Sequence, residues 1–215
     1  MRSFSILVLL IGALMAVSSS PARAQQQSWI FMTHAAFFAD TTQGSDPVDP
    51  HVFVRDPSVP AGTGPENVQH VAAFRPEDQA TDDHTSALYN ANGKALGFNI
   101  GKWLNSAGTV SVDSSGMGDR LHFGYTGLIE SGHYDMFRFN PTTGGIFPLD
   151  GAGTTNAFTA TPLGTADFYV TTPAHLTTFD RVLLIYNSDG LDHPMQPGTF
   201  GVDSHVELVL RVKLV

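Results

Sequence analysis

The stretch Arg120–Asn140 constrains the fold most strongly, because it has the pattern of two β-strands joined by a short connection. Leu121, Phe123 and Tyr125 recur at a period of two residues, the side-chain period of a strand. The connection, GLIESG, begins and ends with glycine, which adopts backbone angles that other residues resist. The second run, Tyr134–Phe139, is rich in aromatic residues, as strands packed in a core tend to be. This pair of strands predicts an all-β domain.

The chain after residue 86 continues this rhythm of short strands and turns. Asn92-Gly93 is a tight-turn signal, and Lys94–Leu104 follows it as a predicted strand with the character of a sheet edge. Arg181–Asn187 is nearly all apolar, which predicts a buried strand. No ten-residue segment after residue 24 has a clear helical period. We therefore predict an antiparallel β-sandwich of immunoglobulin-like or jelly-roll-like type, with an irregular N-terminal extension.

The last segment, Ser204–Val215, alternates between apolar and polar residues. Val206 and Leu208 fall on one face, which we expect to be buried. His205 and Glu207 fall on the other face, which we expect to be mostly exposed to water, as is usual for an antiparallel strand. The side chains expected to be buried in one cluster are Leu121, Phe123, Tyr125, Leu128, Phe137, Leu184, Val206, Leu208 and Leu210.

Residues 1–24 have the pattern of a cleavable export signal. Arg2 provides a positive start, Ile6–Val17 is an apolar run, and Ala22-Arg23-Ala24 matches the small-x-small cleavage pattern. The alternative is an uncleaved membrane anchor, but the apolar run is shorter than the roughly 20 residues that a membrane crossing needs. We expect a secreted or periplasmic protein that begins at Gln25 and has no membrane attachment after cleavage.

Two regions follow the signal, residues 25–86 and residues 87–215. In the first, Ser28–Phe38 is an apolar run in which Trp, Ile, Phe and Thr favour a strand over a short helix. Asp40–Gly64 contains four prolines and has the composition of a loop, interrupted by the short run His51–Val54. We assign the sandwich core to residues 87–215.

Charge and cysteine content exclude several classes of protein. The formal net charge is −9 at pH 7 with histidine neutral, and only 14% of the residues are charged. A negative chain is repelled by phosphates, which argues against nucleic acid and anionic membrane surfaces as partners. The chain has no cysteine, so disulfides, thiolate metal sites and a cysteine nucleophile are excluded.

Three phrases together resemble a group of secreted microbial β-sandwich proteins, mostly of undefined function. They are ALYNANGKALGFNIGKW (Ala87–Trp103), LHFGYTGLIESGHYDMFRF (Leu121–Phe139) and LLIYNSDGLDHPMQPGTFGVDSHVELV (Leu183–Val209). In that group a G-L-I-P-N-G-x-Y connection lies in the middle of the domain and an S-D-G…H…H-x-x-L segment ends it. This chain departs from the pattern at Glu130, where the group has proline. The resemblance covers residues 87–215 and implies the sandwich fold and a secreted location.

The pattern of strand, Gly-Leu, short turn and Gly-x-Tyr is also loosely similar to copper–zinc superoxide dismutases and chordin-type domains. Superoxide dismutases carry a His-x-His pair after the Gly-Leu turn, whereas this chain has His133-Tyr134-Asp135. They also have a structural disulfide, which this chain cannot form. The similarity therefore implies hardly any of that family's chemistry.

Histidine and acidic residues gather near the C-terminus and predict a metal site. The predicted ligands are His193, Asp203, His205 and Glu207, with His133 as a further member. Neutral imidazole with carboxylate suits zinc or copper(II). The alternative is the solvated face of an edge strand with a polar loop, and for His133 a hydrogen-bonded, partly buried side chain. We expect the four histidines of the N-terminal region to lie on the surface; they are His34, His51, His70 and His84.

The chain has no motif that identifies a reaction. It lacks a G-x-S-x-G elbow, and its glycine pairs are not followed by Lys-Ser/Thr, as in a phosphate-binding loop. We therefore expect a secreted, non-catalytic β-sandwich that binds a small ligand, a metal ion or a surface partner. The alternative is a metal-dependent redox enzyme that uses copper or zinc, by distant similarity to superoxide dismutase.

Overall fold

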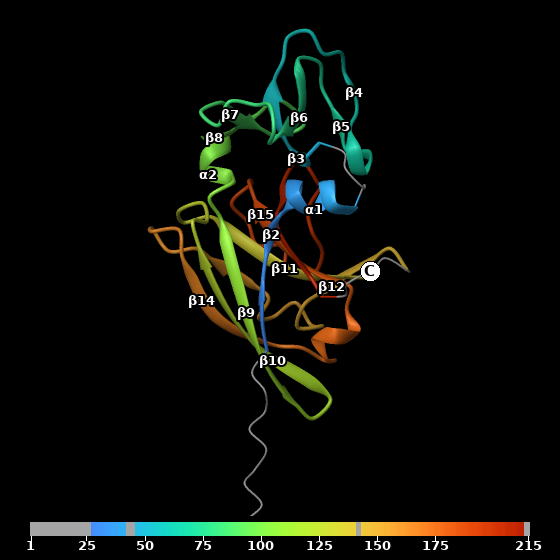
Figure 1. Ribbon diagram of the computed structural model, residues 1–215, viewed down its shortest axis with the longest axis vertical. Helices are drawn as coiled ribbons and strands as arrows, with labels where there is room; N and C mark the ends of the chain where they lie inside the picture. Colours follow the sequence, from blue (N-terminus) through green and yellow to red (C-terminus); the bar gives the residue numbers. More distant parts are fainter. Residues whose placement is uncertain (1–26, 42–45, 141–142, 213–215) are drawn as a thin grey trace, which may run out of the picture.

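The computed structural model describes residues 27–41, 46–140 and 143–212, so the predicted export signal lies outside the described residues. Strands dominate the described part, and the strands of every sheet pair in antiparallel fashion. The predicted all-β, sandwich-like fold is therefore confirmed. Figure 1 shows two parts along the long axis, a sandwich of two sheets and a smaller sheet stacked at one end of it.

The first sheet of the sandwich has the strand order β1-β9-β10-β14. Its strands are β1 (Gln27–Ile30), β9 (Ala107–Ser115), β10 (Gly118–Thr126) and β14 (Ala166–Thr171). Leu121, Phe123 and Tyr125 are buried along β10, so the two-residue period in the sequence identified a strand and its inner face correctly.

The second sheet has the order β12-β11-β15-β16-β2, with β13 also paired to β11. Its strands are β2 (Met32–Thr33), β11 (His133–Asn140), β12 (Gly145–Pro148), β13 (Ala157–Thr159), β15 (Arg181–Asn187) and β16 (Ser204–Arg211). A short 3-10 helix, η2 (Leu176–Thr178), precedes β15.

The connection GLIESG carries the chain from one sheet of the sandwich to the other, because β10 and β11 belong to different sheets. Gly127 has a φ of 74°, and a Cβ atom there would lie 2.2 Å from the carbonyl oxygen of Asn105. Only glycine fits both the angle and the space. Tyr125 of β10 and Tyr134 of β11 therefore both reach the sandwich interior, whereas Phe137 and Phe139 of β11 face outward.

The sandwich interior is one apolar cluster filled from both sheets. It includes Val110, Leu121, Phe123, Tyr125 and Val170 from the first sheet and Tyr134, Met136, Val182, Leu184, Tyr186, Leu208 and Leu210 from the second. Stacked and edge-on aromatic contacts link the two layers, such as the pair Tyr125 and Phe158 at 6.0 Å between ring centres.

The smaller sheet has the order β6-β3-β7-β8. Its strands are β3 (Val48–Arg55), β6 (Phe74–Asp78), β7 (Ala87–Tyr89) and β8 (Ala95–Asn99), and a hairpin of β4 (Gly62–Thr63) and β5 (Gln69–His70) encloses the 3-10 helix η1 (Pro65–Asn67). The helix α2 (Ile100–Trp103) leads from this sheet to β9. The sheet combines strands from both sides of residue 86. The prediction of a loop on both sides of the short run His51–Val54 was wrong for residues 48–50 and 55, since β3 continues over them and is buried along most of its length.

The outer face of the second sheet is also covered, because α1 (His34–Thr41) lies across it. A second apolar cluster forms there from Phe37, Phe137, Leu183, Ile185, Val206 and Val209. The apolar run Ser28–Phe38 thus divides into strand in its first half and helix in its second.

The alternation predicted for the last strand was wrong in two respects. Both faces of β16 are buried, and Val206 belongs to the outer cluster whereas Leu208 belongs to the sandwich interior. The cause is a β-bulge: Ile185 pairs with Val206 and Leu184 with Leu208, so Glu207 is an extra residue. All the side chains expected to be buried are buried, but they are divided between two clusters.

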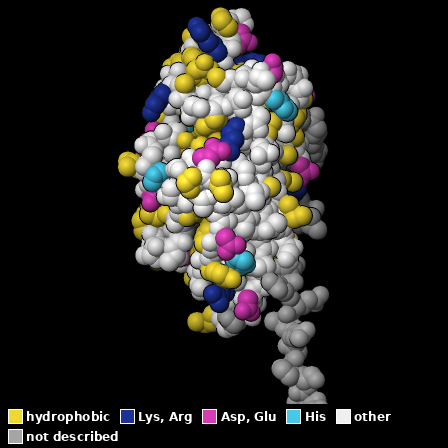
Figure 2. Space-filling model, turned by 90° about the vertical axis from the view of Figure 1, so that its left-hand side faces the viewer, with side chains coloured by type: hydrophobic (Ala, Val, Ile, Leu, Met, Phe, Trp, Pro, Cys, Tyr) yellow, Lys and Arg dark blue, Asp and Glu magenta, His cyan; other side chains and the backbone are white. Residues whose placement is uncertain are grey.

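Charged side chains form no continuous patch on the side of the molecule shown in Figure 2. Figure 2 shows one side, where charged side chains are scattered among uncharged ones. None of the helices in the described ranges has the length and apolar character needed to cross a bilayer.

Candidate metal centre

The small sheet meets the sandwich where two irregular strands come into contact. In β3, Asp49 pairs with Glu77 but Phe53 pairs with Pro76, so the residues between Asp49 and Phe53 bulge away from β6. Pro50 lies in this bulge and has no N–H to offer to a neighbouring strand. The bulge of β3 turns His51 toward β16, where Val206 lies.

His51 is fixed by hydrogen bonds from β16 and from its own strand. The amide of Val206 donates to His51 Nδ1 (3.1 Å), and Nδ1 of His205 donates to the His51 carbonyl (2.7 Å). The ring of Phe200 stacks on the imidazole, with 4.7 Å between centres and 11° between planes. Because Nδ1 accepts a hydrogen bond, the proton of the neutral His51 ring is on Nε2. That atom faces the carboxylate of Glu66.

Asp49 is a buried carboxylate that contacts both His34 and His51. Its Oδ1 accepts the His51 amide (2.9 Å) and faces His34 Nδ1 (3.3 Å), while its Oδ2 accepts Trp103 Nε1–H (2.9 Å). The carboxylate is fully enclosed. Burial would raise the pKa of Asp49, but the hydrogen bond and charge of His34, with the contribution of His51, outweigh burial and hold it below its usual value. Asp49 is therefore ionised and keeps the Nδ1 proton of His34 on its side of the ring.

His34 is the first residue of α1, and Thr33 caps the helix by accepting the Ala36 amide at its hydroxyl (3.3 Å). The imidazole is buried, and its Nε2 lies 3.8 Å from Oε2 of Glu66. Burial alone would lower the pKa of His34. The interactions with Asp49 and Glu66 outweigh burial and raise this pKa to about 9. His34 thus presents Nε2 to Glu66 while Asp49 holds Nδ1, the arrangement in which carboxylates orient metal-binding histidines.

Glu66 reaches the histidines from the β4–β5 hairpin through an unusual backbone. Its φ is 53° and that of Asn67 is 61°, and two successive non-glycine residues in the left-handed region are uncommon. Such conformations cost free energy and persist where the surrounding structure or function requires them. They bring Glu66 Oε2 to 3.0 Å from Nε2 of His51. Burial raises the pKa of Glu66, but the close approach and the charges of the two histidines hold it well below its usual range.

The contact between Glu66 and His51 is close but poorly aligned. Although the two atoms are 3.0 Å apart, His51 Nε2 is buried and makes no hydrogen bond of good geometry. Buried polar atoms are nearly always satisfied, so an unsatisfied one points to a missing partner. The ligand atoms of His34, His51 and Glu66 all lie within 4.8 Å of one another, and within the described ranges this is the one such group of three.

A small pocket opens beside the three side chains. It has a volume of about 80 Å³ and lies on the outer face of the second sheet. Its other lining residues are Phe37, Phe139, Ile146, Arg181, Leu183, Phe200, Val206 and Val209. The centre therefore has a polar end and an apolar body next to it. In Figure 1, α1, which carries His34, lies between the small sheet and the sandwich.

Two of the residues predicted as ligands, His205 and Glu207, are buried in β16 with other partners. His205 donates from Nδ1 to His51 and accepts the Ser188 hydroxyl at Nε2 (3.0 Å). Burial lowers the pKa of His205 to about 4, so the ring is neutral. Its Nδ1–H holds the carbonyl of His51 in place. Glu207 contacts the Ser106 hydroxyl, and burial raises its pKa to about 7.

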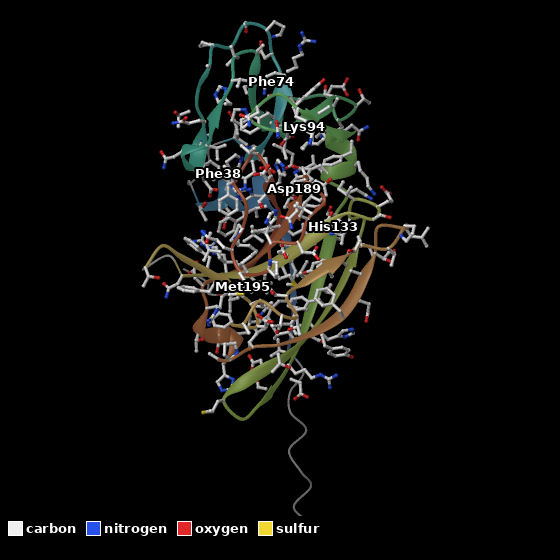
Figure 3. The ribbon with its side chains drawn as sticks, turned by 180° about the vertical axis from the view of Figure 1, so that it is seen from behind. Phe38, Phe74, Lys94, His133, Asp189 and Met195 are labelled. Atoms are coloured by element: carbon white, nitrogen blue, oxygen red, sulfur yellow. The ribbon has the colours of Figure 1, made fainter. Side chains whose placement is uncertain are left out.

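The other three predicted ligands lie in and near the loop between β15 and β16. His193 pairs with Asp189 (2.9 Å), and His133 pairs with Asp192 (2.9 Å). Figure 3 labels Asp189 and His133, which lie near the middle of the long axis. Asp203 is half-buried just before β16, and its carbonyl accepts the Ser188 amide.

None of these five belongs to the group of three that the described residues contain. A metal site built from His193, Asp203, His205, Glu207 and His133 stays a prediction.

Sequence reasoning missed His34, His51 and Glu66. It assigned the two histidines to the surface because they lie in the irregular N-terminal region, where loops carry exposed polar groups. A signal was present, since His34 interrupts the apolar run SWIFMTHAAFF and His51 begins the apolar run HVFV. Glu66 gives no comparable signal, because its role depends on the left-handed backbone of the hairpin.

Comparisons of the chain with family models, curated proteins and solved structures found no match. The function has to be inferred from the geometry of the centre itself.

Proposed function

We propose that the protein binds a transition-metal ion, zinc in the first place, through His34 Nε2, His51 Nε2 and the Glu66 carboxylate. The observation that supports this most directly is the convergence of the three ligand atoms within 4.8 Å. Zinc bonds to nitrogen and oxygen are about 2.0–2.2 Å long, so donors around a tetrahedral ion lie roughly 3.3 Å apart. Glu66 is on a hairpin and its side chain is 39% exposed, so it can make the small adjustment required.

Binding exchanges one hydrogen bond for one metal bond at His51. An ion at Nε2 displaces the proton there, and the neutral ring then carries its proton on Nδ1, opposite the Val206 amide. The loss of that hydrogen bond costs about 1–3 kcal/mol. Metal bonds contribute considerably more, since structural zinc sites are worth about 10–16 kcal/mol. Binding remains favourable, but weaker than at a site with a free Nδ1.

The centre supplies three protein ligands, which leaves the fourth position of a tetrahedral ion available. Structural zinc sites use four protein ligands, whereas sites that exchange ligands or react use three. The three ligands come from α1, β3 and η1, and all three side chains line the pocket. We therefore propose that the ion offers its fourth position to a small molecule in the pocket. This proposal combines two of the functions expected from the sequence for a non-catalytic sandwich, the binding of a metal ion and of a small ligand.

Zinc titration calorimetry on the chain that begins at Gln25 tests the proposal. We expect one ion per chain, and at least tenfold weaker binding in Glu66→Gln and in His34→Ala. His70→Ala is the matched control, because His70 lies on the same hairpin but faces Phe53. His193→Ala tests the ligand set predicted from the sequence. Equal affinity in wild type and Glu66→Gln would reject the proposed centre, and a loss confined to His193→Ala would favour the C-terminal set.

Redox chemistry at copper is the second proposal. Two imidazoles and a carboxylate suit copper(II), and the open fourth position gives access to a small oxidant. The test is superoxide disproportionation by the copper-loaded protein with a chelator that removes free copper. A rate equal to that of the Glu66→Gln variant would exclude redox function at this centre.

A further inference from the structure

A second pocket lies on the opposite side of the second sheet from the candidate centre, where β11 ends. Its volume is about 210 Å³, and neither His34, His51 nor Glu66 lines it. Apolar walls come from Phe147 and Phe179, and the guanidinium of one arginine forms part of the lining. The pocket is therefore separate from the site proposed for the metal ion.

Arg138 is the arginine in this pocket, and two aromatic rings hold its side chain. It follows Met136 on the face of β11 that points into the sandwich. Its guanidinium carbon lies 4.9 Å from the ring centre of Phe179 and 5.6 Å from that of Phe147. Because β11 lies between β12 and β15, the two rings approach from different sides of the strand. Aromatic contacts of this kind hold a guanidinium in place without neutralising it.

The N–H groups of Arg138 have no partner. Among the described residues none forms a hydrogen bond or an ion pair with its guanidinium, and its Nε is buried. Arg181 on the neighbouring strand provides a contrast, because it also lies against two phenylalanine rings but donates from Nε to Asp180 (2.7 Å). Buried donors are nearly always satisfied, so the unpaired Nε points to a missing acceptor.

Acidic residues in the segments around the pocket have partners of their own. Asp180 is paired with Arg181. Asp119 accepts a backbone amide and faces a histidine ring, and Asp150 accepts four backbone amides. None of them contacts Arg138. Recognition at this pocket therefore depends on the short-range contact between unpaired N–H groups and an acceptor, and not on a field that these carboxylates would weaken.

The geometry of Arg138 favours a planar acceptor. The N–H bonds of a guanidinium lie in its plane and form a fork that matches the two oxygens of a carboxylate. With aromatic rings near its faces, the guanidinium is reached along its edge, which is the direction that this pairing uses. A carboxylate therefore satisfies the unpaired donors better than a single hydroxyl or carbonyl oxygen does.

The remainder of the pocket accommodates a ring. An apolar cavity of about 150 Å³ binds benzene, and this pocket measures about 210 Å³. Phe147 is 47% exposed, so its ring offers an aromatic surface beside the guanidinium that a ligand can reach. Aromatic rings pack well against one another in offset or edge-on contacts. A molecule with one carboxylate and one aromatic ring thus matches both the unpaired donors and the apolar walls.

We infer that this pocket binds a small aromatic carboxylic acid. The carboxylate lies at the edge of the Arg138 guanidinium, and the ring of the acid packs against Phe147. This ligand site is additional to the proposed metal function and does not depend on it.

Nuclear magnetic resonance of the ¹⁵N-labelled protein tests the inference, because the Nε–H group of an arginine gives a signal of its own. A chelator keeps metal ions out of the candidate centre, and benzoate, benzamide, acetate and phosphate are titrated separately. We expect benzoate to shift the Nε–H signal of Arg138 in a saturable way. Benzamide has the same ring without the charge, and acetate has the charge without the ring, so each should bind about tenfold more weakly or less.

Three variants assign the contacts. Arg138→Lys removes the Nε–H signal, which identifies it, and keeps the charge without the fork, so benzoate should bind about tenfold more weakly. Phe147→Ala should weaken benzoate but leave acetate unchanged. Arg120→Gln is the matched control, because Arg120 also lies over an aromatic ring, that of Tyr169 (4.2 Å), but on the first sheet. Circular dichroism confirms folding, and Arg138→Gln replaces Arg138→Lys if the latter is unfolded.

Several outcomes would reject the inference. One is a benzoate titration that leaves the Arg138 Nε–H signal unchanged. A second is equal affinity for benzoate and benzamide, since the carboxylate would then contribute nothing. Phosphate bound as tightly as benzoate would indicate a general anion site without a preference for aromatic acids. A loss of affinity in Arg120→Gln as large as in Arg138→Lys would place the ligand elsewhere. Because the chelator keeps the candidate centre empty, none of these results bears on zinc binding.

Discussion

Nδ1 of His51 accepts a hydrogen bond from the backbone amide of Val206, a residue 155 positions later in the chain. The carbonyl of His51 in turn accepts Nδ1–H of His205. Through these two bonds the bulged strand of the small sheet is joined to the bulged strand of the sandwich. A histidine that would otherwise rotate freely is thus oriented by the main chain of a distant strand.

His205 should make stability depend on mildly acidic pH. Burial keeps its pKa at about 4 in the folded protein, whereas an unfolded histidine titrates near 6.5. The unfolded chain therefore binds a proton first, and the stabilisation present above about pH 6.5 is lost as pH falls toward 4, by up to about 3 kcal/mol. Urea unfolding at pH 7.5, 6 and 5 measures this, with His205→Gln as the variant in which that share of the pH dependence disappears. An identical pH dependence in both proteins would contradict it.

Glu77 should have the opposite effect at alkaline pH. It is enclosed opposite Asp49, neither carboxyl oxygen has a hydrogen bond, and burial raises its pKa to about 8. Because the unfolded carboxyl ionises near 4.3, stability falls as pH rises from about 4.5 to 8. Glu77→Gln should therefore exceed wild type in unfolding free energy at pH 8, by about 1–3 kcal/mol, and lose that advantage at pH 4. The control is Glu130→Gln, whose side chain is exposed and pairs with Lys102. If the Glu77→Gln variant is less stable than wild type at pH 8, the carboxylate itself is required for stability.

Metal uptake should release one proton near neutral pH. His34 carries a proton on each ring nitrogen, since Asp49 and Glu66 outweigh burial and raise its pKa to about 9. An ion at Nε2 replaces one of these protons, whereas His51 only moves its proton from Nε2 to Nδ1. Affinity should therefore rise about tenfold per pH unit between pH 6.5 and 8. Calorimetry in buffers of different ionisation enthalpy counts the protons. Two protons released would mean that His51 binds as an imidazolate, and none would mean that His34 is not a ligand.

Phe137 should contribute much of the stability of the outer cluster. Its side chain is fully buried on the α1 side of the second sheet. Phe137→Ala should lower the unfolding free energy by about 3–5 kcal/mol through lost burial and the cavity left behind. Phe147→Ala on the adjacent strand is the control, and a change there as large as at Phe137 would mean that the outer cluster is not packed as described. Thermal unfolding followed by circular dichroism measures both.

Strand periodicity in the sequence identified the sandwich but not the small sheet. The two-residue period around Phe123 and the apolar run of β15 both predicted their strands correctly. Of strand β3 only the short run His51–Val54 was set apart from the loop, because Pro47, Pro50 and the nearby Asp residues have the composition of a loop. In the structure Pro50 lies in a bulge, where a missing N–H costs nothing. If every proline is taken as the end of a strand, a strand that contains proline in a bulge is therefore missed.

The candidate metal centre was beyond sequence reasoning for a similar reason. A period-two pattern placed His205 and Glu207 together on an exposed face, but one extra residue in β16 changes which side each later residue faces. A bulge has no reliable signature in a single sequence. The ligands that do converge come from a helix start, a strand bulge and a hairpin tip, and only the assembled fold brings them together.

The position of Val206 in the chain also fixes when the centre can form. His34, His51 and Glu66 are all synthesised long before Val206, yet His51 is oriented only once β16 lies against it. Chains emerge from the ribosome N-terminus first, so the three ligands leave it as unconnected side chains. If the proposed centre binds an ion, His51 can serve as a ligand only in the completed protein, and metal loading would then report that β16 is in place.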